Sequence, residues 1–269
     1  MTKHLIDRAA GAEDWTIPQS WERFTAEEHR VWDILFARQR ALLEGRAIRA
    51  FHDGLDLLDL GHPGIPDFTA LNARLFPCTG WTVVSVPGLI PDAAFFDLLR
   101  QRRFPAGNFI RSADSLDYLE EPDVFHDVFG HVPLLADPEI ADFMAMLGAL
   151  GLEAIAHNAL HRLSRLYWHT VEFGLAREDG ALKVYGAGIA SSFGETRHAL
   201  EADIPRRDFD LARVMRTAYR SDAMQPGYVV VEDFGALLDE VRRADLPALY
   251  RALEGEQDLS LRPADDLAA

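Results

Sequence analysis

The sequence predicts a mainly helical α+β fold with a few short strands, arranged as one domain. Three observations lead to this expectation. Apolar residues follow helical spacing through long segments, most clearly at 139–152, 152–175, 234–243 and 246–253. Candidate strands are short, at 81–86, 182–185 and 228–231. A chain of 269 residues, of which 48% are hydrophobic, is also long enough to bury a sizeable core.

The first predicted helix begins at Thr25, because Thr25 and Glu28 stand at the two positions of a capping box. Its inward face is expected to carry Val31, Ile34, Leu35 and Leu42. The helix would end near Gly45, and the Gly- and Pro-punctuated stretch 52–66 that follows is expected to be rich in loops.

The middle of the chain alternates short strands with helices. A strand at 81–86 leads through a Pro- and Gly-rich turn at 87–91 into a helix at 93–102. Residues 109–111 are expected to form another short strand, which ends on a charged residue. Asp179-Gly180 is a typical hairpin turn, so strands are expected on both sides of it.

The composition limits the classes of function. We place the domain at 25–253, with a polar wrapping segment at 1–24 and a polar, mobile tail at 254–269. The formal charge of −16, from 27 basic and 43 acidic residues, argues against a nucleic-acid-binding surface. Cys78 is the single cysteine, which excludes an internal disulfide and fits a reducing compartment. Without a signal-peptide pattern or an apolar run near the ~20 residues of a membrane span, the chain is expected to be cytoplasmic.

One stretch, 121–131, combines two histidines and three carboxylates within an otherwise apolar run. His126 and His131 are five residues apart and would point about 140° away from each other on a regular helix. Both can reach one metal ion only if the helix ends or widens between them, and Gly130 is the natural place for that change. Asp123, one turn before His126, could orient its imidazole, and Asp127 could face a cavity. The alternative is two ordinary histidines near a helix end.

A third ligand is predicted from the helical segment 162–175, where Glu172 is the only acid. It is flanked by Val171 and Phe173, so it is either exposed or, if buried, in need of a cation. Two histidines and one carboxylate on one side of Fe(II) leave the other side open for oxygen and a cosubstrate. The hypothesis is therefore a metal site made by His126, His131 and Glu172.

The runs 121–133, 167–175 and 185–195 resemble, in order and spacing, those of the pterin-dependent aromatic amino acid hydroxylases, and most closely the bacterial phenylalanine 4-hydroxylases. The resemblance covers roughly 80–235. It implies one catalytic domain with a deep iron cavity. It also implies an oxidoreductase that converts L-phenylalanine to L-tyrosine with O₂, Fe(II) and tetrahydrobiopterin.

The resemblance also implies the residues around the iron. The pterin would lie against Gly88, Leu89, Ile90, Phe95 and Asp127. The amino acid would lie against Arg111, Pro122, Trp168, Phe173, Gly188 and Ser191, with Arg111 binding its carboxylate. Two positions depart from the animal enzymes, which carry threonine in place of Leu119 and glutamate in place of Asp127. Without space for a regulatory domain or a heptad pattern for a tetramerisation helix, a monomer is expected.

Several alternatives stay open. Within the family, the substrate could be tryptophan or tyrosine. A zinc hydrolase can use the same two histidines and glutamate, with Asp127 as its general base. A non-catalytic, metal-stabilised binding protein is the third reading.

The remaining histidines have less specific patterns. The cluster of His52, Asp53, His62 and Asp67 could form a second metal site, although a loop is the more common explanation of such residues. His157 and His161 have the spacing of a zinc-protease pair but lack its glutamate, so they are expected to be surface or structural residues. His169 is expected to be a packed polar residue.

Overall fold

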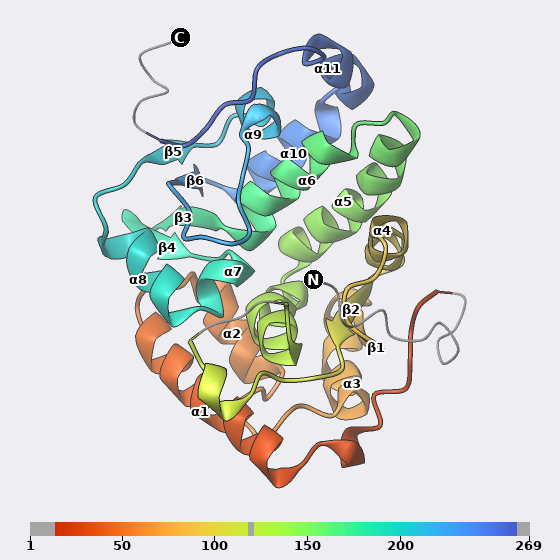
Figure 1. Ribbon diagram of the computed structural model, residues 1–269, viewed down its shortest axis with the longest axis vertical. Coiled ribbons are helices and arrows are strands. Elements are labelled where there is room, and N and C mark those ends of the chain that lie inside the picture. Colours follow the sequence, from red (N-terminus) through yellow and green to blue (C-terminus); the bar gives the residue numbers. More distant parts are fainter. Residues whose placement is uncertain (1–13, 118–120, 263–269) are drawn as a thin grey trace.

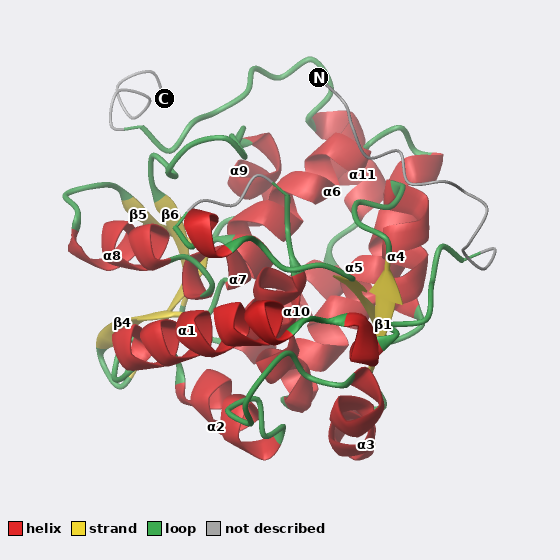
Figure 2. Cartoon of the chain, turned by 60° about the horizontal axis from the view of Figure 1, so that its bottom comes forward, coloured by secondary structure: helices red, strands yellow, loops and turns green. Residues whose placement is uncertain are grey.

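Helices make up most of the structure, a computed structural model that describes residues 14–117 and 121–262, and two small sheets lie among them (Figure 2). The α-helices are α1 (Ala26–Leu43), α2 (Arg49–Leu57), α3 (Phe68–Thr79), α4 (Asp92–Arg100), α5 (Pro138–Ala156), α6 (Leu160–Tyr167), α7 (Ala187–Ala190), α8 (Phe193–Glu201), α9 (Leu211–Arg216), α10 (Phe234–Arg243) and α11 (Leu246–Ala252). Short turns of other helix types are η2 (Trp21–Arg23), η3 (Ala113–Ser115), η4 (Phe125–His131), η5 (Val132–Ala136) and η6 (Trp168–Glu172). The predicted mainly helical class is confirmed.

The two sheets stand on opposite sides of the segment that carries η4 (Figure 1). The strands are β1 (Thr82–Val86), β2 (Arg103–Gly107), β3 (Gly174–Glu178), β4 (Ala181–Val184), β5 (Arg206–Asp208) and β6 (Tyr228–Val231). β1 and β2 are parallel, in register from Thr82 opposite Arg103, and α4 connects them. The second sheet has the order β4-β3-β6-β5, with β3 and β4 antiparallel and the other pairs parallel. Residues 109–111 lie outside both sheets, so the strand predicted there is wrong.

The β3–β4 hairpin turns at Asp179-Gly180, as predicted. Both residues have positive φ, 52° and 76°, which is the conformation that a two-residue turn needs to match the twist of its strands. β3 starts two residues after Glu172, and therefore the position of the hairpin is tied to that of this predicted metal ligand.

Helix α1 begins with the predicted capping box, in which Thr25 and Glu28 bond each other's backbone N–H. Val31 and Leu35 are buried, but Ile34 is 43% exposed, so its predicted inward position is wrong. Trp32 is buried in its place and meets the ring of Phe125 edge-on, with 5.3 Å between ring centroids. The aromatic side of α1 thus packs directly against η4.

The stretch predicted to be loop-rich contains α2, and this expectation is wrong for its first part. Gly54 weakens the helical pattern in the sequence but has a packing role. A Cβ at this position would lie 2.1 Å from the carbonyl oxygen of Pro133, so only glycine lets α2 reach η5 so closely.

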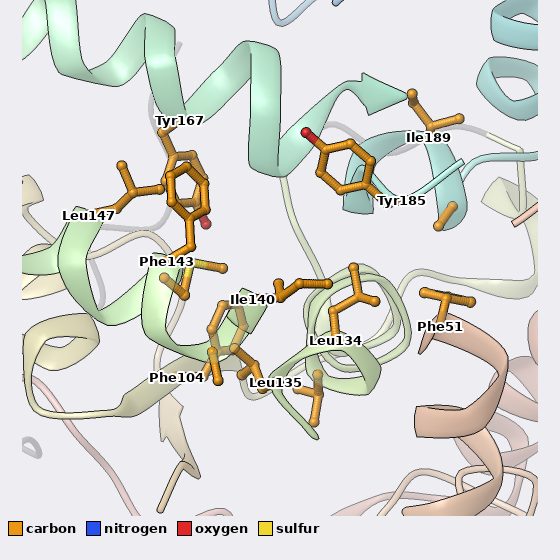
Figure 3. Packing of buried hydrophobic residues seen from close by; sticks show 14 of the residues in the cluster. Phe51, Phe104, Leu134, Leu135, Ile140, Phe143, Leu147, Tyr167, Tyr185 and Ile189 are labelled. Carbon is orange, nitrogen blue, oxygen red and sulfur yellow. The ribbon is translucent and has the colours of Figure 1, made fainter. Parts of the chain in front are cut away.

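The single helix predicted over 152–175 is interrupted. α5 ends at Ala156, and Asn158 has a φ of 55°, a left-handed conformation that no α-helix continues through. α6 then starts at Leu160 and runs into η6. Buried side chains of η5, α5 and α6 pack together in the hydrophobic core (Figure 3).

The chain ends are attached to the domain wherever the structure describes them. Near the start, Ile17 bridges to Ser85. Near the end, Arg165 binds both carboxylate oxygens of Asp258, at 2.7 and 2.6 Å, and Leu261 is only 2% exposed. The described part of the predicted mobile tail is therefore docked, which corrects that expectation. No helix in 14–117 and 121–262 combines the length and hydropathy needed to cross a bilayer.

Candidate metal centre

His126 and His131 lie at the two ends of η4, which is a π-helical turn. In a π-helix the backbone bonds join residues five apart, so two side chains at that spacing face the same side. The imidazole ring centroids are 5.1 Å apart. The predicted local widening of the helix is confirmed. A Cβ on Gly130 would lie 2.9 Å from the carbonyl oxygen of Ala187, so this glycine lets η4 pack against α7.

Glu172 ends a second π-helical turn, η6, which continues α6. Its side chain is 14% exposed, which excludes the alternative of a solvent-facing carboxylate. Its Oε2 lies 3.5 Å from Nε2 of His126, and its Oε1 lies 3.2 Å from Nε2 of His131. The three side chains therefore converge, as predicted. Among the described residues this is the only group of three side chains of metal-ligand type, with all ligand atoms within 4.8 Å of one another.

The charges of these side chains suit a divalent cation. Burial lowers the pKa of His126 to about 4, so its imidazole is neutral. Burial acts to raise the pKa of Glu172, but its electrostatic interaction and its hydrogen bond with His131 outweigh burial, and the pKa is lowered. A neutral imidazole and an ionised carboxylate are the states that coordinate metals. Two nitrogen donors and one oxygen donor beside a cavity fit Fe(II) with open positions.

Ser191 fixes the ring of His126. The Ser191 hydroxyl donates to the carbonyl of Ala187 at 2.8 Å, so toward Nδ1 of His126, 2.9 Å away, it can only accept. The proton is therefore on Nδ1, and Nε2 carries the lone pair that faces Glu172. The expectation that Asp123 orients this imidazole is wrong, because Asp123 accepts from the backbone N–H of His126 instead.

Asp123 is fully buried and forms an ion pair with Arg111. Nε and Nη2 of Arg111 donate to its two carboxylate oxygens at 2.8 and 2.9 Å. Burial acts to raise the pKa of Asp123, and the bonds and charge of Arg111 reverse that effect, so the pKa is lowered. Nη1 of Arg111, with a long 3.4 Å contact to the carbonyl of Leu116, is the part of the guanidinium that the ion pair leaves free for other partners.

A cavity of about 370 Å³ opens beside the three candidate ligands. Residues predicted to contact the pterin or the substrate line it, namely Gly88, Leu89, Ile90, Phe95, Pro122, Asp127 and Trp168. Five other predicted residues are not among its lining residues, namely Arg111, Asp123, Phe173, Gly188 and Ser191. Phe173 supports the wall from behind, with its ring centroid 4.7 Å from that of Trp168. Gly188 leaves space for that ring, because a Cβ there would lie 2.7 Å from it.

Residues 13–250 match the family described as biopterin-dependent aromatic amino acid hydroxylase. The chain belongs to this family. It is 52% identical to the phenylalanine-4-hydroxylase of Caulobacter vibrioides over 92% of this chain and 84% of that protein. It is 46% identical to the phenylalanine-4-hydroxylase of Chromobacterium violaceum over 95% of this chain and 86% of that one.

Solved structures of the Chromobacterium violaceum enzyme share the fold of this hydroxylase. Its iron- and phenylalanine-bound structure matches with a TM-score of 0.89 at 44% identity, covering 94% of this chain and 92% of that one. A second structure, with bound iron(III) and oxidised cofactor 7,8-dihydrobiopterin, also gives a TM-score of 0.89, at 46% identity, covering 94% and 91% of the two chains.

Asp127 lines the cavity of the hydroxylase, in line with the expectation that it faces one. It accepts the backbone N–H of Gly107 at 2.8 Å, and burial raises its pKa to about 7. Phe95 also lines the cavity and meets the ring of Tyr167 edge-on. Leu89, at the rim, is 73% exposed. Leu119, the second departure from the animal enzymes, lies outside the described residues.

Some lining residues of the hydroxylase had no signal in the sequence. Tyr219 lies in the irregular segment between α9 and β6, where neither periodicity nor a motif marks it. Its ring stacks on Trp168, with centroids 4.2 Å apart and planes at 14°. Tyr167, near the end of α6, also lines the cavity.

The other histidines of the hydroxylase have structural positions. The proposed second metal cluster does not form among the described residues: Nε2 of His52 contacts the carbonyl of Leu43, and Asp67 caps α3. His157 and His161 are exposed, as expected. His169 is buried with Nε2 3.0 Å from the carbonyl of Thr217, which confirms that it is a packed polar residue.

Proposed function

We propose that this chain is a monooxygenase that converts L-phenylalanine to L-tyrosine with O₂ and a tetrahydropterin at Fe(II) held by His126, His131 and Glu172. The observation that carries the proposal is the buried convergence of these three side chains beside a cavity of about 370 Å³. Relatives named phenylalanine-4-hydroxylase and a neighbouring structure with iron and phenylalanine support it.

The chain's own residues bind and orient the reactants. When bound, the iron and the reduced pterin supply the activation of O₂ and the two electrons that reduce its second oxygen atom. Ser191 holds His126 in the tautomer whose Nε2 faces the ion. Trp168 and Pro122 supply flat, apolar walls for an aromatic ring within the same cavity as the ligands. Positioning is the main contribution of such a site to the rate.

The polar end of the substrate needs a cation, and Arg111 is our candidate. The pair with Asp123 uses Nε and Nη2 and so holds the guanidinium plane in one orientation, while Nη1 keeps donor capacity for a carboxylate. Gly188 and Ser191 would contact the same end of the amino acid. Arg111 is not among the lining residues, so the proposal includes a movement of its guanidinium toward the cavity when the amino acid binds.

The reduced pterin would bind at the opposite part of the cavity. Phe95 would stack on its ring, and the backbone of 88–90 would bond its edge. Asp127, with its raised pKa, is placed to contact the same heterocycle. These roles are residue-by-residue proposals that rest on cavity lining and on family membership.

Product analysis tests the proposal. The protein is loaded anaerobically with Fe(II), and O₂, a reduced pterin and one aromatic amino acid are then added. We expect tyrosine from phenylalanine, with little product from tyrosine or tryptophan. If the protein prefers another aromatic amino acid, the proposed substrate is wrong, but the proposed class of reaction stands. A zinc-dependent hydrolase would consume neither O₂ nor pterin, and a binding protein would turn nothing over.

We also propose that the protein acts as a monomer in the cytoplasm. A net charge of −16 opposes self-association, and a single cysteine fits a reducing compartment. Light scattering after size-exclusion chromatography measures the mass, and a particle near 30.1 kDa is expected. A mass of twice that value would contradict the monomer.

A further inference from the structure

Gln225 is a buried amide next to the cavity wall, and its side-chain hydrogen bonds go to that wall and to its own segment. It is 2% exposed. Its Oε1 accepts the indole N–H of Trp168 at 3.1 Å. Its Nε2 donates to the carbonyls of Arg220 and Ala223 at 2.9 and 3.2 Å. The side chain of Gln225 therefore bonds both Trp168, which lines the cavity, and the turn at 220–223, which comes just before Gln225 in the chain.

The backbone of Gln225 is fastened to the rest of the fold. Its N–H donates to Oε1 of Glu195 at 3.1 Å, and its carbonyl lies 3.0 Å from Nε2 of His198. Glu195 and His198 are both on α8, and Glu195 also accepts the hydroxyl of Tyr228 in β6 at 2.5 Å. The backbone of Gln225 is thus bonded to α8 and, through Glu195, linked to β6. Gln225 therefore holds the cavity wall in a fixed position relative to this helix and strand.

The residues that Gln225 restrains face the reactants. Trp168 and Tyr219 both line the cavity, and Tyr219 stacks on the indole. Tyr219 belongs to a segment without helix or strand and is 37% exposed, so its own backbone gives it little support. The indole has a single N–H donor, and its bond to Gln225 is the one directional polar restraint on its rotation.

We propose that Gln225 is a positioning residue for the aromatic substrate: it sets the plane of Trp168 and, through the stack, the place of Tyr219. The inference deepens the proposed function and rests on it for the identity of the ring that this wall contacts. Loss of the amide leaves a buried indole N–H without its partner, and the wall gains alternative orientations. Substrate binding then suffers more than the chemical step, because the metal ligands keep their places.

Kinetics of Gln225→Leu test the role. We expect KM for phenylalanine to rise about tenfold, kcat to change less, and less tyrosine to form per pterin oxidised. Met224→Ala is the matched control, because Met224 is the neighbouring residue but is 52% exposed; its KM should equal that of the unchanged protein. In a Trp168→Phe background, Gln225→Leu should add little, because the donor that Gln225 restrains is already gone.

A readout without iron or pterin separates this inference from the proposed function. The indole N–H signal of Trp168 is assigned by its disappearance in Trp168→Phe. In metal-free Gln225→Leu this signal should shift and exchange faster with solvent, while the other indole signals stay in place. An unchanged signal, or full additivity with Trp168→Phe, overturns the proposal. If Gln225→Leu does not fold, Gln225→Met, which keeps the volume, serves for the same measurements. An enzyme inactive on phenylalanine refutes the function but leaves the indole result valid.

Discussion

The hydroxyl of Ser191 lies 2.9 Å from Nδ1 of His126 and fixes which ring nitrogen faces the candidate metal. The two residues are 65 positions apart in the chain, and α7 brings them together by packing on η4. Groups that orient a metal-bound imidazole in this way contribute strongly to metal affinity.

Ser191→Ala is expected to weaken Fe(II) binding roughly 10- to 100-fold, because His126 loses the acceptor that holds its tautomer. Titration of metal-free protein with Fe(II) measures the affinity. Ser192→Ala is the matched control, since that hydroxyl caps α8 and does not contact the site. Equal affinities for both variants would remove the orienting role of Ser191.

Glu172→Gln should lose bound iron and hydroxylation together, because a neutral amide is a poor ligand for a divalent cation. Metal analysis of the purified, folded variant measures the loss. Glu153→Gln, on the exposed side of α5, should bind iron like the unchanged protein. Stoichiometric iron and normal turnover in Glu172→Gln would contradict the ligand assignment.

Arg111→Ala is expected to lower the free energy of unfolding by about 3–5 kcal/mol, because it leaves the carboxylate of Asp123 buried and unpaired. Denaturant unfolding measures this change. The surface pair of Arg74 and Asp59 is half exposed on both sides, so Arg74→Ala should cost less than about 1 kcal/mol. Similar losses of unfolding free energy in the two variants would show that the buried pair of Arg111 and Asp123 stabilises the fold no more than a surface pair does.

In the folded fraction of Arg111→Ala, KM for phenylalanine should also rise steeply. Arg111→Lys separates the two effects, because lysine keeps the charge beside Asp123 but cannot form the two-pronged contact. We expect Arg111→Lys to recover most of the stability that Arg111→Ala loses. Its KM for phenylalanine should stay nearly as high as that of Arg111→Ala. An unchanged KM in both variants would exclude Arg111 from substrate binding.

The stability of the metal-free protein should fall as the pH decreases from about 6.5 toward 4, in part because of His169. Burial lowers its pKa to about 4 from the ordinary value of 6.5. Between these values the unfolded chain binds the proton and the folded chain does not, so acid favours unfolding by up to about 1.4 kcal/mol per pH unit. Urea unfolding at several pH values should show a smaller slope for His169→Gln. Parallel slopes for the two proteins would contradict this assignment.

Much of the fold was readable from the sequence because its signals are local. The capping box at Thr25, the hairpin turn at Asp179 and the helix at 234–243 each depend on residues within a few positions of one another. The three metal-ligand candidates were also predictable, since a five-residue histidine spacing and a lone acid in an apolar helix need a common explanation. The family resemblance supplied the chemistry that this pattern alone left open.

Tertiary structure decided what depends on contacts between distant segments. The close approach of α7 decides whether Gly130 caps a helix or lies in a widened turn. Burial of the ion pair decides whether the carboxylate of Asp123 binds the side chain of His126 or that of Arg111. Tyr219 reaches the cavity, and Gln225 bonds Trp168 in its wall, only because the segment between α9 and β6 folds over Trp168, 57 residues away from Gln225 in the chain. Local sequence patterns do not contain the energies of contacts between distant segments, because the packing of the whole domain determines those contacts.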